Sequence, residues 1–256
     1  MKILLIGAGN VATCIADAIR NAGHKIVGVY SRTEENARAL AESLCTVYSC
    51  NLSELPEADV CLTMLRDDAL LEHASTIVRC NPDAIHLHTS GSVPMSVWQD
   101  AGSRHCGVLY PMQTFSKGKR IDWRNVPFFV EASSDDCLAC VKALASSLSD
   151  SVTELDSRQR CRMHLAAVFA CNFSNRMFAI SEAILKECGI PFSVMKPLIE
   201  ETCGKALVMS PKDAQTGPAV RGDDRVMSVH RNLLMSDPEW QELYRMISDD
   251  IINAYK

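Results

Sequence analysis

The sequence predicts an α/β domain followed by a smaller all-α domain, and three observations support this prediction. Through the first half of the chain, short apolar runs alternate with amphipathic helical segments, as they do in successive βαβ units. Each run is apolar along its whole length, which is typical of strands in a parallel sheet that is covered on both faces. After Asp156 the strand-like runs stop and only helical periodicity remains.

The predicted elements account for most of the chain. Strands are expected over residues 2–6, 25–30, 60–65, 84–88, 107–110, 128–131 and 152–155. Helices are expected over residues 10–21, 33–44, 137–148 and 157–187, with three or more further helices after them. We therefore predict a doubly wound, mainly parallel sheet in residues 1–153, followed by an all-α domain in residues 154–256.

The composition is that of a globular protein without a polyanionic partner. Apolar residues make up 47% of the chain, and the formal net charge is −5. No stripe of Lys and Arg runs along any segment, so nucleic acids and anionic membrane surfaces are poor partners. No apolar stretch approaches the roughly 18 residues of a membrane span, and the N-terminal run is too short for a signal-peptide core. We therefore expect a cytoplasmic protein whose 12 scattered cysteines are reduced.

Two short motifs contain metal-ligand residue types. Cys137 and Cys140 form a C-x-x-C, but with the apolar residues that follow they have the spacing of a buried helix stripe. No second pair completes a zinc site. His86 and His88 alternate on a predicted strand, and such a pair is more often structural than metal-binding. We therefore predict no metal site and interpret both motifs as parts of the core.

A glycine-rich turn joins the first predicted strand to the first predicted helix. Residues 7–12 read GAGNVA, a G-x-G-x-x-A in the strand–turn–helix context of a dinucleotide-binding fingerprint. The first glycine allows the tight turn, the second lets the backbone approach a diphosphate, and the small alanine lets the helix pack closely on the strand. The motif predicts a Rossmann fold. The residues expected to hold the cofactor here are Gly7, Gly9, Asn10, Val11 and Ala12.

The end of the second strand indicates which dinucleotide binds. NAD-binding folds usually place an Asp or Glu there, as an acceptor for the ribose hydroxyls. This chain has Ser31 and Arg32 instead, and a hydroxyl and a guanidinium suit the 2′-phosphate of NADP. The prediction is NADP, and the alternative interpretation is that Arg32 is an ordinary exposed loop residue.

Loops at the carboxyl ends of the middle strands are expected to line the rest of the cleft. In open α/β sheets the ligand lies outside those strand ends. The loops after the third, fourth and fifth predicted strands leave the sheet at that edge. The side chains expected to line the cofactor cleft from these loops are Met64, Leu65, Thr89 and Ser90, with Gln113 as a further candidate for the reaction site.

The long predicted helix carries the candidate catalytic residues. His164, Asn172 and Asn175 fall on one side of it at helical spacing, and we expect these polar side chains to lie on an otherwise apolar, largely buried helix. In the functional interpretation, His164 donates a proton and Asn172 orients the substrate. In the alternative interpretation, the same side chains form a satisfied polar network inside the core.

These motifs, together with HTSG at 88–91, YPMQTF at 110–115, HLAA at 164–167 and TGPAVRGD at 216–223, resemble the family described as putative NADP oxidoreductases. That family joins a Rossmann-like domain to a helical domain of unassigned function. The resemblance implies this fold, NADP binding and a homodimer built through the helical domains, but no particular substrate. We expect the helical domain to take part in substrate binding. The N-terminal part is also similar to pyrroline-5-carboxylate reductase and to the deazaflavin-dependent NADP oxidoreductases.

One departure from better-understood relatives limits the expected chemistry. The β-hydroxyacid dehydrogenases carry a catalytic Lys one turn before an Asn on the first long helix, whereas this chain has Val168 one turn before Asn172. The leading hypothesis is therefore an oxidoreductase that transfers a hydride between NADPH and a small carbonyl, imine or hydroxy compound. The alternative is a sensor or regulatory protein that binds NADP without turnover. Apolar residues along the helical domain, such as Phe169 and Phe173, also favour a homodimer.

Overall fold

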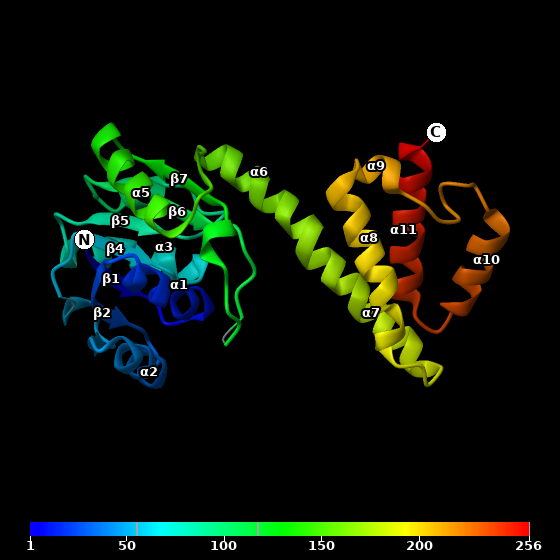
Figure 1. Ribbon diagram of the computed structural model, residues 1–256, viewed down its shortest axis with the longest axis horizontal. Coiled ribbons are helices and arrows are strands. Elements are labelled where there is room, and N and C mark those ends of the chain that lie inside the picture. The colour runs from blue at the N-terminus through cyan, green and yellow to red at the C-terminus, as the bar shows by residue number, and fades with distance from the viewer. Residues whose placement is uncertain (55, 117, 256) are drawn as a thin grey trace. The chain divides into compact units, whose positions relative to one another are not determined.

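The computed structural model describes residues 1–54, 56–116 and 118–255, which form two compact units. The first unit spans Met1–Ala170 and the second Cys171–Lys256 (Figure 1). This division lies later in the chain than the domain boundary that we predict after residue 153. That domain boundary stays a prediction. The reason for the later division is that the first turns of the long helix pack on the sheet, with Met163 against Val108 and Phe129.

The first unit is built on an eight-stranded sheet with the order β3-β2-β1-β4-β5-β6-β7-β8. All neighbouring strands are parallel except β6 and β7. The strands are β1 (Lys2–Ile6), β2 (Lys25–Tyr30), β3 (Val47–Ser49), β4 (Val60–Thr63), β5 (Ile85–His88), β6 (Cys106–Pro111), β7 (Phe128–Ala132) and β8 (Val152–Glu154). The predicted fold class, a mainly parallel Rossmann-type sheet followed by helices, is confirmed. Strand β3 was not predicted, because this short edge strand has no buried residue to produce an apolar run.

Helices cover both faces of the sheet. They are α1 (Asn10–Asn21), α2 (Glu34–Leu44), α3 (Asp67–Cys80), α4 (Ser96–Asp100) and α5 (Asp135–Leu148), with 3₁₀ turns at η1 (Leu52–Glu54) and η2 (Trp123–Asn125). Alternate side chains of β1 point to opposite faces. Ile3 and Leu5 lie in a core with α1, α2 and α5, whereas Leu4 and Ile6 lie in a core with α3 and α4. The sheet is therefore buried on both sides, as its wholly apolar strands predict.

The C-x-x-C motif lies on α5, and the structure corrects half of its interpretation. Cys137 is buried, and its Sγ lies 3.7 Å from the ring of His105. Cys140 is exposed. The buried stripe of α5 continues from Cys137 to Val141 and Leu144, so Cys140 lies off that stripe and the prediction that it packs in the core is wrong.

The segment from Ser157 to Glu187 is helical throughout, as predicted, but its geometry changes in the middle. It consists of α6 (Ser157–Ala167), the π-helical η3 (Val168–Phe173) and α7 (Ser174–Glu187). A capping box between Asp156 and Gln159 starts α6. A π-helical turn contains one extra residue, so side chains after it are rotated relative to those before it.

The second unit is helical in its described residues. Besides α7 it contains η4 (Phe192–Met195), α8 (Lys196–Val208), α9 (Pro211–Ala214), α10 (Asp224–Leu233) and α11 (Pro238–Ala254). Met177, Ile184 and Trp240 line an apolar cavity of about 270 Å³ inside this unit. Among the described residues, no helix is long and apolar enough to span a membrane.

Candidate functional site

The order of the strands creates a crevice at the carboxyl ends of β1 and β4. From β1 the sheet continues to β2 on one side, and from β4 it continues to β5 on the other. This is the topological switch point where ligands bind in such sheets. The glycine turn follows β1, while Met64 and Leu65 follow β4. Gly7 N donates to the carbonyl oxygen of Tyr30 at 2.8 Å, so the predicted cofactor segments after β1, β2 and β4 meet at one edge.

The two glycines of the turn are required for different reasons. Gly7 has a φ of +119°, and a Cβ there would lie 2.6 Å from the carbonyl oxygen of Met64. A Cβ on Gly9 would meet no heavy atom of the described residues within 4 Å, so the space in front of Gly9 is open. Helix α1 begins at the next residue, Asn10, and its first N–H groups lack intrahelical partners. Open space beside a helix N-terminus fits a dinucleotide diphosphate.

The loop after β2 is cationic. Ser31, Arg32 and Thr33 follow the strand, and Arg32 is exposed. The hydroxyl oxygen of Ser31 accepts a hydrogen bond from Thr33 N at 3.3 Å. Burial raises the pKa of Tyr30, and the charge of Arg32 opposes that shift. The guanidinium therefore lies near the strand end at which a Rossmann fold places the adenosine ribose.

A pocket of about 280 Å³ extends from the glycine-turn helix to α6, entirely within the first unit. The predicted site residues that line it are Val11, Met64, Leu65, Thr89, Ser90, Gln113 and His164. The other lining residues are Asp67, Gly91, Ser92, Tyr110, Pro111 and Phe115. The fold thus brings one end of the glycine motif and the predicted proton donor into a single cavity.

His164 lies in this pocket beside Tyr110. The hydroxyl oxygen of Tyr110 is 3.1 Å from Nδ1 of His164, and the two rings meet edge-on at 79°. A Cβ on Gly91 would lie 2.7 Å from the His164 ring, so only glycine leaves room for the imidazole there. Burial raises the pKa of Tyr110, and the charge of Arg160 opposes that shift. Tyr110 is therefore protonated at neutral pH, and its hydroxyl can donate to Nδ1 of the neutral imidazole or accept from Nδ1–H of the imidazolium.

Asn172 and Asn175, the two asparagines predicted to align with His164, do not line its pocket. Asn172 lies in η3 and Asn175 in α7, both in the second unit. Both are exposed, so the expectation that they sit on a largely buried helix is wrong. The π-helical turn also breaks the regular spacing on which the predicted alignment with His164 depends. A role for Asn172 toward the substrate stays a prediction.

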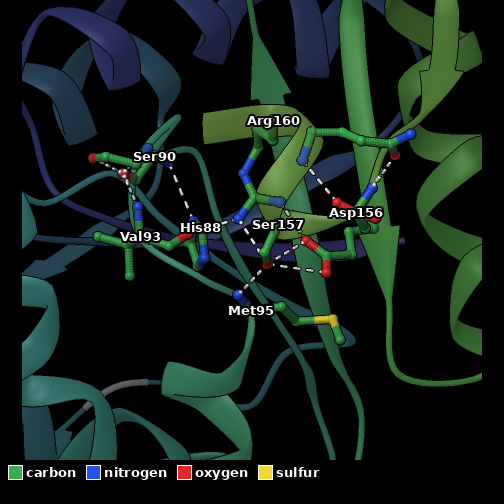
Figure 2. Close-up of polar contacts among 10 residues, drawn as sticks. His88, Ser90, Val93, Met95, Asp156, Ser157 and Arg160 are labelled. Atoms are coloured by element: carbon green, nitrogen blue, oxygen red, sulfur yellow. Dashed lines mark hydrogen bonds and ion pairs between the residues drawn. The ribbon is translucent and has the colours of Figure 1, made fainter. Parts of the chain in front are cut away.

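The loop after β5 forms hydrogen bonds within itself and to Asp67 of α3. His88 Nδ1 accepts from Ser90 N at 3.2 Å, and the Ser90 hydroxyl oxygen accepts from Val93 N at 3.0 Å (Figure 2). The hydroxyl of Ser92 donates to Asp67 at 2.5 Å. Burial lowers the pKa of His88 to about 3 and that of His86 to about 4. Both imidazoles are therefore neutral at pH 7, which supports their interpretation as core residues.

Tyr110 was not predicted as a site residue, and Gly91 was predicted only as part of the loop after the fourth predicted strand. Both belong to motifs visible in the sequence, but neither has a local signature of function. Tyr110 is a residue with a polar hydroxyl near the C-terminal end of the otherwise apolar strand β6. Its contact with His164 depends on how α6 packs. In the sequence, Gly91 cannot be distinguished from an ordinary loop glycine. Its requirement comes from the His164 ring, which occupies the space that a Cβ would need.

Two segments of the chain match the models of two protein families. Residues 1–85 match the family described as shikimate / quinate 5-dehydrogenase. Residues 126–251 match a domain of unknown function, DUF2520. No curated protein matches this chain.

Solved structures give a match over the whole chain. A protein from Thermotoga maritima is 21% identical, with a TM-score of 0.74 and coverage of 99% of this chain and 98% of its own. An imine reductase from Myxococcus stipitatus, in complex with NADP+, is 14% identical, with a TM-score of 0.65 and coverage of 100% and 93%. These two matches show the fold. A putative NADP oxidoreductase from Bacteroides fragilis is 47% identical, with a TM-score of 0.93 and coverage of 98% of each chain. This chain therefore belongs to the same putative NADP oxidoreductase family as the Bacteroides fragilis protein.

Proposed function

We propose that this protein is an NADP-dependent oxidoreductase that transfers a hydride between NADPH and a small carbonyl, imine or hydroxy compound. The observation that carries the proposal is the shared pocket, because Val11 of the glycine-turn helix and His164 line the same cavity. A Rossmann fold by itself supports only nucleotide binding. A proton donor in the same cavity adds the second component that carbonyl or imine reduction needs.

The cofactor would be held at the switch point of the sheet. Gly7, Gly9 and the start of α1 suit the diphosphate, and Ser31 and Arg32 suit the 2′-phosphate. Met64, Leu65 and the Thr89–Ser90 loop line the pocket beyond them. When bound, the nicotinamide would supply the hydride.

The protein itself would contribute the proton donor, His164, and the pocket in which the proton is transferred. In this proposal His164 acts as the imidazolium, whose Nδ1–H donates to the hydroxyl oxygen of Tyr110, and the contact length of 3.1 Å permits that bond. Nε2–H of the imidazolium then gives its proton to the reduced oxygen or nitrogen of the substrate, which leaves His164 as the neutral imidazole with its hydrogen on Nδ1. Asn172 stays our candidate for orienting the substrate, and replacing it with Ala should raise KM more than it lowers kcat.

A homodimer is part of the proposal. In the helical unit, Leu198, Leu207 and Val208 on α8 are 63%, 86% and 80% exposed. Apolar surface of this extent favours a protein partner, and a second copy of the chain is the simplest one. Light scattering at micromolar concentration should give twice the chain mass of 28.2 kDa, and a monomer would contradict the dimer.

The function is tested by following NADPH oxidation against a panel of keto acids, ketones and cyclic imines. We expect turnover with at least one compound class. Replacing His164 with Ala should lower kcat by about a hundredfold or more and change NADPH affinity little, as expected for a proton donor. Tight NADPH binding without turnover on any compound would instead favour a sensor, and no NADPH binding would exclude both functions.

A further inference from the structure

Arg160 is a buried cation one helical turn before His164. Its side chain is 1% exposed, and its guanidinium forms an ion pair with Glu131 on β7. Nη2 of the same guanidinium donates to the carbonyl oxygen of Val93 at 2.6 Å and to the hydroxyl of Ser157 at 3.2 Å. Arg160 therefore joins α6, β7 and the loop after β5.

Ser157 completes this connection. Its hydroxyl donates to a carboxylate oxygen of Glu131 at 2.8 Å and accepts from the backbone N–H of Met95 at 3.0 Å. Figure 2 shows Arg160 and Ser157 side by side, with Val93 and Met95 of the loop bonded to them. The loop is thus held at two backbone positions by the first turn of α6.

The other end of that loop contacts the reaction site. Gly91 lies against the His164 ring, and Ser90 lines the pocket. On α6, Met163 packs against the cluster that contains Tyr110. One short stretch of helix therefore fixes both the loop that shapes the pocket and the imidazole inside it.

Stability by itself does not account for a buried ion pair at this place. Well-packed apolar residues of similar size are often as stable as a buried pair or more so. A lysine also cannot replace the planar guanidinium, because its single Nζ cannot lie at the positions of both Nη1, which bonds Glu131, and Nη2, which bonds Val93. The guanidinium bonds Glu131 and the carbonyl oxygen of Val93 at the same time. It therefore fixes the positions of β7 and the loop after β5 relative to each other.

We propose that Arg160 is a positioning residue, which sets the placement of His164 relative to Tyr110 and the Gly91 loop through Val93, Ser157 and Glu131. Its catalytic consequence rests on the proposed function, whereas the placement itself does not. Misplacing a reacting group by about 1 Å can lower a rate by about a hundredfold.

The placement is tested by NMR of the histidine side chains in the ¹⁵N-labelled full chain. His164→Gln assigns the His164 signals, and Tyr110→Phe gives their position when the tyrosine contact is lost. Arg160→Met should move the His164 signals toward the Tyr110→Phe position, and Arg160→Lys should restore only part of the difference. The matched control is Arg162→Met, which removes an exposed cation from the same helix and should leave the signals unchanged.

The kinetic arm measures kcat, substrate KM and NADPH affinity for the same variants. Arg160→Met should lower kcat by about ten- to a hundredfold, with NADPH affinity nearly unchanged. If Arg160→Met does not fold, Ser157→Ala serves instead, because it removes one neutral hydroxyl and should shift the His164 signals in the same direction. A folded Arg160→Met or Ser157→Ala protein with unchanged His164 signals would overturn the proposal. If the unmodified protein oxidises no NADPH, the proposed function fails, while the NMR result still decides the placement.

Discussion

The glycine turn and the loop after β5 are both parts of the same site, yet they differ in how their geometry is determined. The turn is local: residues 7–12 carry their own requirements, with a positive φ at Gly7 and open space at Gly9. The β5 loop depends on distant residues, since Arg160 and Ser157 hold Val93 and Met95 across more than sixty positions of sequence. A motif can therefore predict the first region, whereas the second exists only after α6 has packed.

The strongest test of the local region is Gly9→Val. We expect NADPH binding to be abolished while the fold is kept, because the new side chain fills open space in front of the helix N-terminus rather than a packed core. Isothermal titration with NADPH and a thermal melt measure the two effects. Unchanged affinity in a folded variant would remove this turn from the cofactor site.

The matching test of the long-range region is Arg160→Met. It should lower the free energy of unfolding by about 3–5 kcal/mol, because it leaves the Glu131 carboxylate largely buried without its cation. The double variant Arg160→Met with Glu131→Leu should recover most of that loss, since both charges are then gone. Urea unfolding checks both, and equal stability of the two variants would show that the charge pair is not the cause.

The two buried histidines of β5 predict acid sensitivity in this same region. Burial lowers the pKa of His88 to about 3 and that of His86 to about 4. Their contribution to stability is therefore complete above the unfolded-state pKa of about 6.5 and is lost as the pH falls toward those values. Between pH 7.5 and pH 5 the free energy of unfolding should fall by on the order of a few kcal/mol. The slope should be smaller in His88→Gln, and a flat profile in the unmodified protein would contradict this origin.

The smallest expected effect concerns cofactor choice. Arg32→Ala should weaken NADPH binding by about ten- to a hundredfold, equivalent to about 1.5–3 kcal/mol for one charge-assisted contact. NADH binding should change little, because NADH lacks the 2′-phosphate. Equal affinities of the unmodified protein for NADPH and NADH would rule out this role for Arg32.

The sequence by itself determined the Rossmann-type sheet, the helical C-terminal part and the location of the glycine turn. These follow from apolar periodicity and from backbone requirements that lie within a few residues of one another. The same local reasoning selected His164, but it placed Asn172 and Asn175 on a buried row and counted Cys140 in the core. Only the structure could correct these points, since a π-helical turn and the burial of one helix face depend on packing.

The tertiary structure alone decided what surrounds His164. Tyr110 comes from β6, Gly91 from the loop after β5, and Arg160 with its partner Glu131 from α6 and β7. None of these residues has a neighbour in sequence that signals its role. Their partnership arises because α6 packs against β6 and β7, and contacts between segments so far apart leave no periodic or local pattern in the chain.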